Sequence, residues 1–323
     1  MKFVIHKPLV YVLIHVDRRF FVLLDNLLKE FIFELKIKNY SDRTIDTYKY
    51  NVGLLITYLN EHHEVDDIED IAPFHIKKFV QHQIGLGKKA NYINTLIKSL
   101  RSFFKYLVTE EYVPMNVMNK IKLLKEDTEV IKTFTDDEVA KMIDSYDFKS
   151  YLNARNKVIL AMFVDTGIRM SELINLQSEW VYDTNIRIMG KGSKWRFAPI
   201  SLMLKKYMIR YERIKAKYFE KKALEHDNYF LTRAGKPICT VQIENIVKNA
   251  GLRADVRKDI RCSPHTLRHY AIQANLRNGL DLYSCSKIAG HENIQVTKRY
   301  LQGLETENIL EMAQKTSPLM NLR

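Results

Sequence analysis

Residues 263–269 read SPHTLRH, and this stretch constrains the interpretation of the chain more than any other. His265 and Arg268 are three positions apart, so on a helix their side chains lie on the same side. Taken alone, such a pair is usually an ordinary surface feature. Four further parts of the second half carry groups that suit the same site: TGIRMSEL at 166–173, GKGSK at 190–194, AGH at 289–291, and Tyr300, nine residues after His291.

Two arginines, a lysine, two histidines and a tyrosine are the groups needed for phosphoryl transfer without a metal ion. Arg169 and Arg268 supply guanidinium forks, which match the non-bridging oxygens of a phosphodiester. A tyrosine hydroxyl has an ordinary pKa of ~10, so it needs a proton acceptor or electrostatic help to attack near neutral pH. A lysine at the tip of a hairpin is suited to protonate the departing oxygen, although it also fits an ordinary solvated turn.

In this order, the motifs resemble those of the tyrosine recombinases, the family of phage integrases, Xer chromosome-dimer resolvases and transposon integrases. The resemblance rests on TGIRxSEL, SPHxLRH and the Gly-His pair that precedes Tyr300, with Thr297 between them. It covers roughly residues 22–313, because the first half also resembles the family's core-binding domain. Ala289 departs from the leucine usual before Gly-His, which affects packing more than chemistry.

The resemblance implies a role for each matching residue. Tyr300 is the nucleophile that forms a 3′-phosphotyrosine, and Arg169 and Arg268 hold the scissile phosphate. Lys191 is the general acid, with Lys194 as a less favoured alternative. The remaining expectations are His265 as base or proton relay, His291 as a hydrogen-bond donor to the phosphate, Glu172 as a carboxylate that steadies a catalytic side chain, and His269 as a structural residue.

The fold expected is mainly α. Apolar residues at three- and four-residue spacing predict a helix from Leu23 to Leu35, and Ser41 is a good N-cap for the next helix. Further helices are expected from Pro73 to Ile84 and from Ala90 to Leu107. The expected organisation is a leader (1–21), a four-helix, SAM-like core-binding domain that binds DNA (22–112), a linker (113–133), and a mixed, mostly helical catalytic domain with a small β-hairpin (134–323).

Alternation of apolar and polar residues predicts a β-hairpin from 185–189 and 195–200, with Lys191 near its tip. Tyr229 to Leu231 are a candidate short third strand. The segment 205–222 has many basic residues with tyrosines at helical spacing. It fits either a helix that binds phosphates or a solvated basic face.

The formal charge of +13 favours a polyanionic partner. Residues 1–128 carry 19 Lys and Arg against 16 Asp and Glu, and residues 129–323 carry 32 against 22, so the second half is the more basic. Nucleic acid is the first candidate partner and an anionic membrane surface the second. The three cysteines lack disulfide or metal-ligand spacing and suit a cytosolic protein. No metal or nucleotide motif is present, so no cofactor, neither ATP nor Mg²⁺, is expected.

The resemblance further implies a cytoplasmic, nucleoid-associated enzyme for DNA integration, excision or dimer resolution, either Xer-like or carried by a mobile element. The implied partner is double-stranded DNA with inverted repeats, bound by a homotetramer. A short helix at 305–315 then packs on a neighbouring subunit or folds back on its own domain. Two rivals stay open: DNA relaxation of the type IB topoisomerase kind, and a DNA-binding regulator that only retains the fold.

Overall fold

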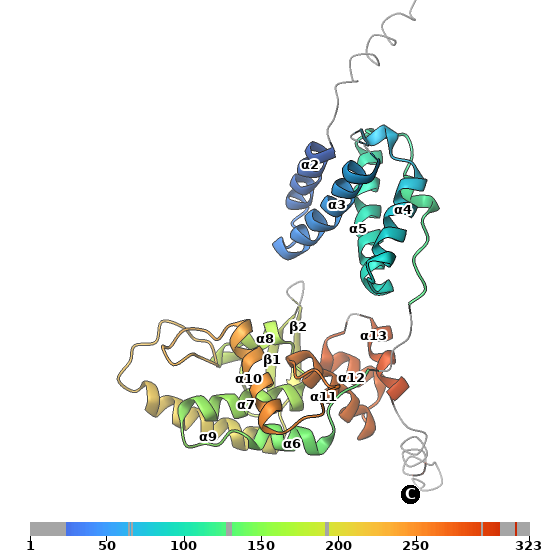
Figure 1. Ribbon diagram of the computed structural model, residues 1–323. Coiled ribbons are helices and arrows are strands. Elements are labelled where there is room, and N and C mark those ends of the chain that lie inside the picture. The colour runs from blue at the N-terminus through green and yellow to red at the C-terminus, as the bar shows by residue number, and fades with distance from the viewer. Residues whose placement is uncertain are drawn as a thin grey trace, which may run out of the picture. The chain divides into compact units, whose positions relative to one another are not determined.

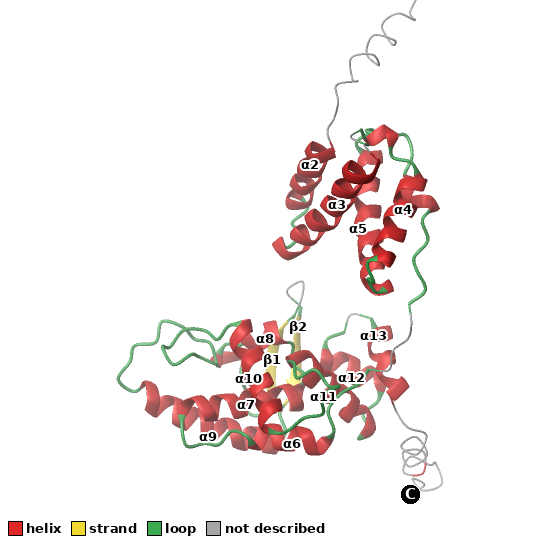
Figure 2. Ribbon diagram, viewed as in Figure 1, coloured by secondary structure: helices red, strands yellow, loops and turns green. Residues whose placement is uncertain are grey.

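The computed structural model describes residues 24–63, 65, 67–126, 131–190, 194–291, 293–303 and 314. The chain divides into two compact units, residues 1–128 and 129–323 (Figure 1). Three predictions lie outside the described residues: the leader at 1–21, the role of Lys191, and the helix at 305–315. The mainly helical fold with one small antiparallel sheet is confirmed (Figure 2).

In the described part of the first unit, four α-helices surround one apolar core. They are α2 (Leu24–Ile37), α3 (Asp42–His63), α4 (Pro73–Gly85) and α5 (Ala90–Thr109), with a 3₁₀ turn η1 (Ile68–Asp70) before α4. Phe31 of α2 and Phe103 of α5 pack edge to face with ring centroids 5.4 Å apart. Pro73 stands in the first turn of α4, where its missing N–H costs nothing.

The segment after α5, expected to be a linker, packs on the first unit as far as residue 126. It contains η2 (Val117–Lys120), and Met118 and Ile121 are buried in the core of that unit. Arg101 donates to the Ile121 carbonyl at 2.6 Å, and the Asn94 amide pairs with the backbone of Leu124 at 2.9 and 2.8 Å. These bonds satisfy backbone groups that a free linker would leave to water.

The second unit is organised around α7 (Tyr151–Thr166), which is apolar on nearly all sides and therefore buried. Thr135 and Glu138 cap the start of the helix that precedes α7 through reciprocal bonds. The other helices are α6 (Asp136–Asp144), α8 (Met170–Ile174), η3 (Ser178–Trp180), α9 (Leu202–Phe219), α10 (Thr240–Arg253), α11 (Pro264–Arg277), α12 (Leu282–Ala289), α13 (Ile294–Lys298) and η5 (Arg299–Gly303).

The sheet is a two-stranded antiparallel hairpin, β1 (Asn185–Met189) with β2 (Trp195–Pro199). Ile186 and Ala198 face each other and are buried, as the alternation predicts. The candidate third strand at Tyr229–Leu231 is wrong, because Leu231 makes only an isolated bridge with Pro237. The Leu231 carbonyl is already bonded to the Tyr151 hydroxyl and to Arg155, so it is not free for a strand ladder.

No helix within the described ranges is both long and apolar enough to cross a bilayer.

Candidate active site

Helix α11 presents the SPHTLRH segment to the rest of the second unit. Ser263 caps the helix by accepting from the Thr266 N–H, and Pro264 stands in its first turn. Arg268 is buried, and its guanidinium donates to the Gly167 carbonyl and, at 2.6 Å, to the Ala289 carbonyl. Its side chain therefore joins the end of α7 to the end of α12.

The charge of Arg268 is retained in this setting. Burial and the neighbouring charge of Arg169 lower its pKa to about 10, with Glu172 opposing them. An arginine with this pKa is still protonated at neutral pH. The site therefore contains two close cations before any substrate arrives, an arrangement suited to an anion.

Glu172 holds the two arginines that surround it. Its carboxylate accepts from the Arg169 side chain at 2.9 Å and from the Arg169 N–H at 2.8 Å, as the sequence predicts. Arg196 of β2 forms a two-pronged pair with the same carboxylate at 2.6 and 2.8 Å. Burial alone acts to raise the pKa of Glu172, but the bonds and charges of Arg196 and Arg169 outweigh it and lower that pKa.

Arg196 is a residue of this network that sequence reasoning missed. Besides its pair with Glu172 it donates to the Ile288 carbonyl at 3.0 Å. It packs so tightly on Gly290 that a Cβ at Gly290 would lie 2.9 Å from the Arg196 side chain. The signal available in the sequence was a lone arginine on a strand predicted to be half buried, a place where arginine usually needs a partner.

The Arg196–Glu172 pair predicts a pH-dependent loss of stability. In Arg196→Met, the free energy of unfolding at neutral pH should fall by about 3 kcal/mol, because a buried carboxylate loses its main partner. The lowered pKa of Glu172 means that its ionised form stabilises the fold above the unfolded pKa, and that this contribution is lost as pH falls through the folded pKa. The difference from the parent protein should therefore narrow at acidic pH, measured by denaturant unfolding at several pH values.

Arg187→Met is the matched control on the same hairpin. The Arg187 guanidinium lies 4.0 Å from the centroid of the Trp195 ring, a contact at an exposed ring that contributes about 1 kcal/mol or less. The stability lost in Arg187→Met should depend little on pH between 3 and 7, the range in which a glutamate with an ordinary pKa of ~4.3 titrates. Equal losses in the two variants would contradict the importance given to the Glu172 pair.

Tyr300 lies in η5 with its ring buried beside Ile272 and Cys285. Burial raises its pKa to about 12, against the opposing charges of Arg268 and Arg299. The hydroxyl is therefore protonated at neutral pH. It needs a proton acceptor before it can act as a nucleophile.

Two histidines flank the Tyr300 ring. His269 Nδ1 lies 2.6 Å from the Tyr300 hydroxyl, and the His291 ring is nearly parallel to the Tyr300 ring at 6.4 Å. His291 Nδ1 is 2.7 Å from the buried Thr297 hydroxyl, which fixes the ring orientation. Burial, and then the charges of Arg268, Arg169 and Arg196, lower the pKa of His291 to about 4.

His265 occupies the exposed edge of this cluster. Its ring packs edge to face on the His269 ring with centroids 4.0 Å apart. Partial burial, and then Arg268 and Arg261, lower its pKa. Sequence reasoning gave His265 the role of base or proton relay and His269 a structural role, yet His269 is the histidine in contact with the Tyr300 hydroxyl.

The base of the hairpin turn, at Gly190, lies beside the arginine network. The Gly190 N–H donates to the Lys194 carbonyl at 2.8 Å, which closes the base of the turn, and a Cβ on Gly190 would lie 4.0 Å from Glu172. Lys194 is exposed, and Lys191 itself lies outside the described residues. The turn that carries Lys191 therefore starts beside the carboxylate that holds Arg169.

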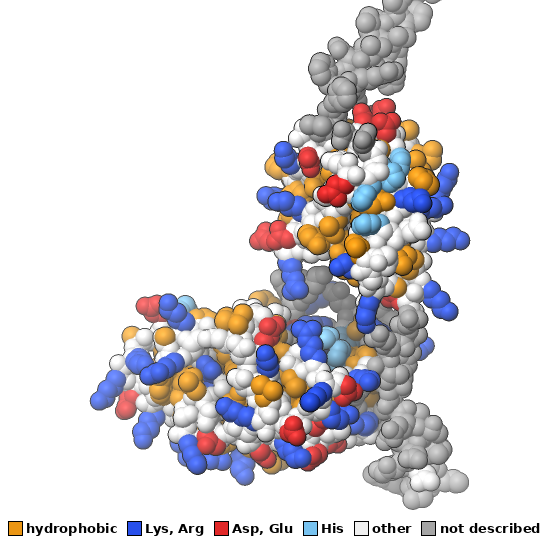
Figure 3. Space-filling model, viewed as in Figure 1, with side chains coloured by type: hydrophobic (Ala, Val, Ile, Leu, Met, Phe, Trp, Pro, Cys, Tyr) orange, Lys and Arg blue, Asp and Glu red, His pale blue; other side chains and the backbone are white. Residues whose placement is uncertain are grey.

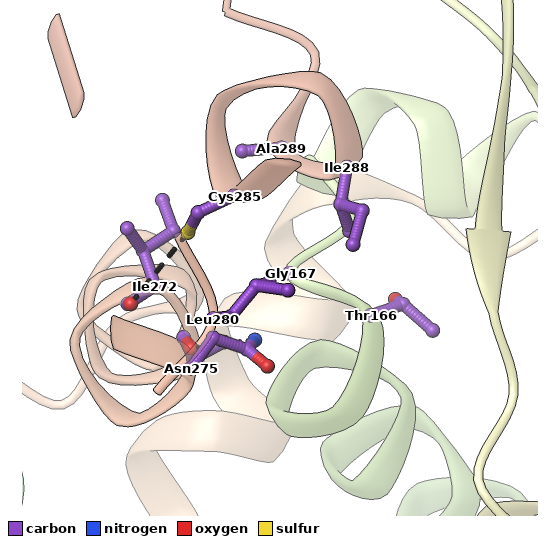
Figure 4. A pocket seen from close by; sticks show the side chains of 9 residues that line it. Thr166, Gly167, Ile272, Asn275, Leu280, Cys285, Ile288 and Ala289 are labelled. Carbon is purple, nitrogen blue, oxygen red and sulfur yellow. Dashed lines mark hydrogen bonds between the residues drawn. The ribbon is translucent and has the colours of Figure 1, made fainter. Parts of the chain in front are cut away.

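A small cavity lies behind the site, between α7, α11 and α12 (Figure 4). Its volume is about 10 Å³ and its walls include Gly167, Ile272 and Cys285. Such a space holds at most about one water molecule. The cavity is therefore a packing gap beneath the side chains described above and not a site for a small substrate.

The basic helix α9 uses several of its cations inside the protein. Lys215 donates to the carbonyls of Asn228 and Tyr229 at 3.2 and 2.8 Å, and burial lowers its pKa. The Arg210 guanidinium lies 4.1 Å from the Phe148 ring centroid. In Figure 1, α9 runs along the lower edge of the second unit, whereas β1 and β2 stand at the upper edge. These contacts favour a helix whose basic side chains stabilise the fold over a helix that binds phosphates.

The salt dependence of DNA binding tests α9. We expect Lys217→Ala with Lys221→Ala to leave unchanged the slope of log binding constant against log salt concentration. These two exposed lysines lie on or beside a helix placed away from the arginine network. Each lost phosphate contact would reduce that slope by about one. A slope reduced by this amount would indicate that these lysines contact DNA phosphates.

Both parts of the chain match known protein families. Residues 132–307 match the sequence model of the phage integrase family, and residues 28–111 match the phage integrase N-terminal SAM-like domain. The tyrosine recombinase XerD of Staphylococcus aureus is 29% identical over 281 residues, which cover 86% of this chain and 94% of that protein. The tyrosine recombinase XerC of Thermodesulfovibrio yellowstonii is 28% identical over 286 residues, 87% of this chain and 92% of that protein.

Solved structures share the fold at lower identity. A XerH site-specific recombinase bound to a palindromic difH substrate, in a post-cleavage complex, superposes with a TM-score of 0.70 at 17% identity, over 92% of this chain and 85% of that one. A lambda integrase dimer bound to a COC′ core site gives a TM-score of 0.71 at 17% identity, over 93% and 83%.

Proposed function

Since this chain belongs to the phage integrase family and is a tyrosine recombinase, we propose that Tyr300 cuts and rejoins DNA through a 3′-phosphotyrosine. The observation that carries the proposal is that Arg268 and His291 lie beside the buried Tyr300, with Arg169 next to both of them. These groups come from the start of α8, from α11, and from the turn after α12. Only the folded chain brings them to one place.

The proposed reaction begins with a phosphodiester held by the two guanidinium groups. Each guanidinium has five N–H donors. Arg169 donates to the Glu172 carboxylate and to the Gly290 carbonyl, and Arg268 donates to the Gly167 and Ala289 carbonyls, so donors remain on both side chains for the phosphate. As the Tyr300 oxygen bonds to phosphorus, the bond to the 5′ oxygen breaks. Lys191 on the hairpin tip protonates that oxygen, which leaves as a hydroxyl.

His291 is assigned to the phosphate. Its pKa of about 4 makes the ring neutral at neutral pH, and Thr297 holds Nδ1. In one tautomer Nδ1–H donates to the Thr297 hydroxyl, and the bare Nε2 can only accept a hydrogen bond. In the other tautomer the proton is on Nε2, and Nε2–H donates to a phosphate oxygen. We assign the second tautomer, in which the Thr297 hydroxyl donates to Nδ1.

Rejoining is the reverse of cleavage, with a 5′ hydroxyl from a second DNA strand as the attacking group. The bond energy is kept in the phosphotyrosine, so the reaction as proposed uses neither ATP nor Mg²⁺. The proposed domain roles keep the division expected from the sequence. Residues 22–112 bind the core site, 113–133 connect the two parts although residues 113–126 pack on the first unit, and 134–323 carry the chemistry.

The proposed assembly is a tetramer on two DNA sites with inverted repeats. The solved XerH complex contains a palindromic substrate, and the lambda integrase complex contains a dimer on one core site. A protein that binds as two copies reads a site with matching symmetry. Because the proposed partner is DNA, we propose that the enzyme acts at the nucleoid. Integration, excision and dimer resolution are the outcomes this chemistry serves.

Recovery of covalent adducts tests the proposal. The protein is incubated with fragmented DNA from its host, denatured in detergent, and the DNA that stays attached is sequenced. We expect enrichment of one site with inverted repeats of about a dozen base pairs, roughly one helical turn per bound half. A plasmid with two such sites should then yield strand exchange, and cross-linking should trap four copies per pair of sites.

Two other outcomes would redirect the function. Relaxation of supercoiled DNA without strand exchange would indicate chemistry of the type IB topoisomerase kind. Binding without any denaturation-resistant adduct would indicate a DNA-binding regulator. The arrangement of Tyr300 between His269 and His291 favours the recombinase over the regulator, because a regulator has no use for a buried hydroxyl bonded to a neutral histidine.

A further inference from the structure

The contact between His269 and Tyr300 is formed by tertiary structure. His269 lies on α11 and Tyr300 in η5, 31 positions apart, and the two atoms that meet are the ring Nδ1 and the phenol oxygen, 2.6 Å apart. The ring centroids are 5.3 Å apart and the two ring planes are tilted by 54°. A separation this short is at the strong end for a hydroxyl donor.

The proton in this contact belongs to the tyrosine. Burial comes first among the causes that lower the pKa of His269 to about 4, followed by His265, Arg268, Arg299 and His291. The ring is therefore neutral at neutral pH. The phenol is also neutral, with a pKa of about 12, so the tautomer of His269 decides the direction of the bond. We assign the tautomer with the proton on Nε2, in which Tyr300 donates and the bare Nδ1 of His269 accepts.

Within the proposed recombinase reaction, we propose that His269 is the catalytic base that takes the Tyr300 proton. As the Tyr300 oxygen bonds to phosphorus, its proton moves to His269 Nδ1 and the ring becomes an imidazolium. The electron pair of the breaking bond goes to the 5′ oxygen, which receives a proton from Lys191. In rejoining, the tyrosine oxygen leaves phosphorus and takes the proton back from His269.

The timing of this transfer follows from the pKa values. A phenol at about 12 does not give its proton to a ring at about 4 while both are at rest. Two events reverse this preference. A phosphodiester held by Arg268 offsets one of the charges that lower the pKa of His269, and bond formation to phosphorus makes the phenol oxygen strongly acidic.

His265 is placed for a different task. Its exposed ring packs on the ring of His269, one helical turn away, and reaches solvent rather than the nucleophile. This position suits contact with DNA or onward passage of a proton. The structure thus separates two histidines that the sequence motif presents side by side.

The test compares two replacements of His269 on a nicked duplex that carries the site recovered as an adduct. Asparagine keeps an oxygen acceptor near the position of Nδ1 but cannot take a proton at neutral pH, and leucine keeps neither property. We expect both variants to slow adduct formation by about 10²–10⁴-fold. An asparagine variant near the parent rate would overturn the proposal, because the contact would then only position Tyr300. A leucine variant near the parent rate would do the same.

A more acidic nucleophile gives a second, independent readout. A difluorotyrosine in place of Tyr300 loses its proton more easily, so it should restore the rate of His269→Asn by at least about tenfold relative to its effect on the parent. His265→Asn is the matched variant. Rescue of His265→Asn without rescue of His269→Asn would give the base to His265 and overturn the assignment.

Gel-shift binding and thermal unfolding of each variant report whether folding and DNA affinity persist, so that slow adduct formation is read only from folded, bound protein. Failure of this inference and failure of the proposed function are distinguishable. The first leaves a parent protein that forms the adduct and an equally active His269→Asn variant. The second leaves a parent protein that forms no adduct at all.

Discussion

Tyr300→Phe should abolish the covalent protein–DNA adduct while DNA binding persists. The phenylalanine ring fills the same pocket beside Ile272 and Cys285, so the local packing is kept. One hydroxyl contributes little to an interface dominated by phosphate contacts, and affinity should change by less than about 1 kcal/mol. Denaturing gels on a nicked duplex measure the adduct, and gel shifts measure the binding.

Tyr300→Phe should also lower the stability of the folded protein. The Tyr300 hydroxyl is bonded to His269, so its removal leaves a part-buried ring nitrogen without that partner. A stability loss of about 1–2 kcal/mol is expected from the unfilled acceptor. Tyr283→Phe is a suitable control, since Tyr283 is exposed on α12. An adduct that survives Tyr300→Phe would remove Tyr300 from the role of nucleophile.

Lys191→Ala and Arg169→Ala should differ in their response to an altered leaving group. If Lys191 supplies a proton, its loss slows cleavage by about 10²–10⁴-fold on ordinary DNA. A bridging 5′ sulfur leaves without protonation, so a substrate with that sulfur should restore most of the rate. Single-turnover adduct formation on the two substrates measures the effect.

Arg169→Ala should show no such rescue. Its guanidinium stabilises charge on the phosphate oxygens, and loss of one donor of this kind costs about 10²–10³-fold whichever atom leaves. The variant should stay folded because Arg196 still pairs with Glu172 through two bonds. Equal rescue of both variants, or rescue of neither, would contradict the separate tasks given to Lys191 and Arg169.

Much of the local structure could be predicted because its causes are local. The helices α4 and α5 begin at the predicted residues, Pro73 and Ala90, since apolar spacing and a first-turn proline act within a few residues. The hairpin that starts at Asn185 follows in the same way. The third strand was wrong because the Leu231 carbonyl is bonded to Tyr151, 80 positions away in sequence.

The sequence by itself determined which chemical groups the protein has for phosphoryl transfer and in what order they occur. Arg169, Arg268 and Tyr300 can be recognised from the sequence alone, because the residues of each motif lie close together in the chain. Only the tertiary structure decided which histidine touches the nucleophile and which arginine holds Glu172. Helix packing brings α11 against η5 and β2 against α12, and such distances depend on the whole core rather than on neighbours in the chain. For that reason the contacts of His269 with Tyr300 and of Arg196 with Glu172 became visible only in the folded protein.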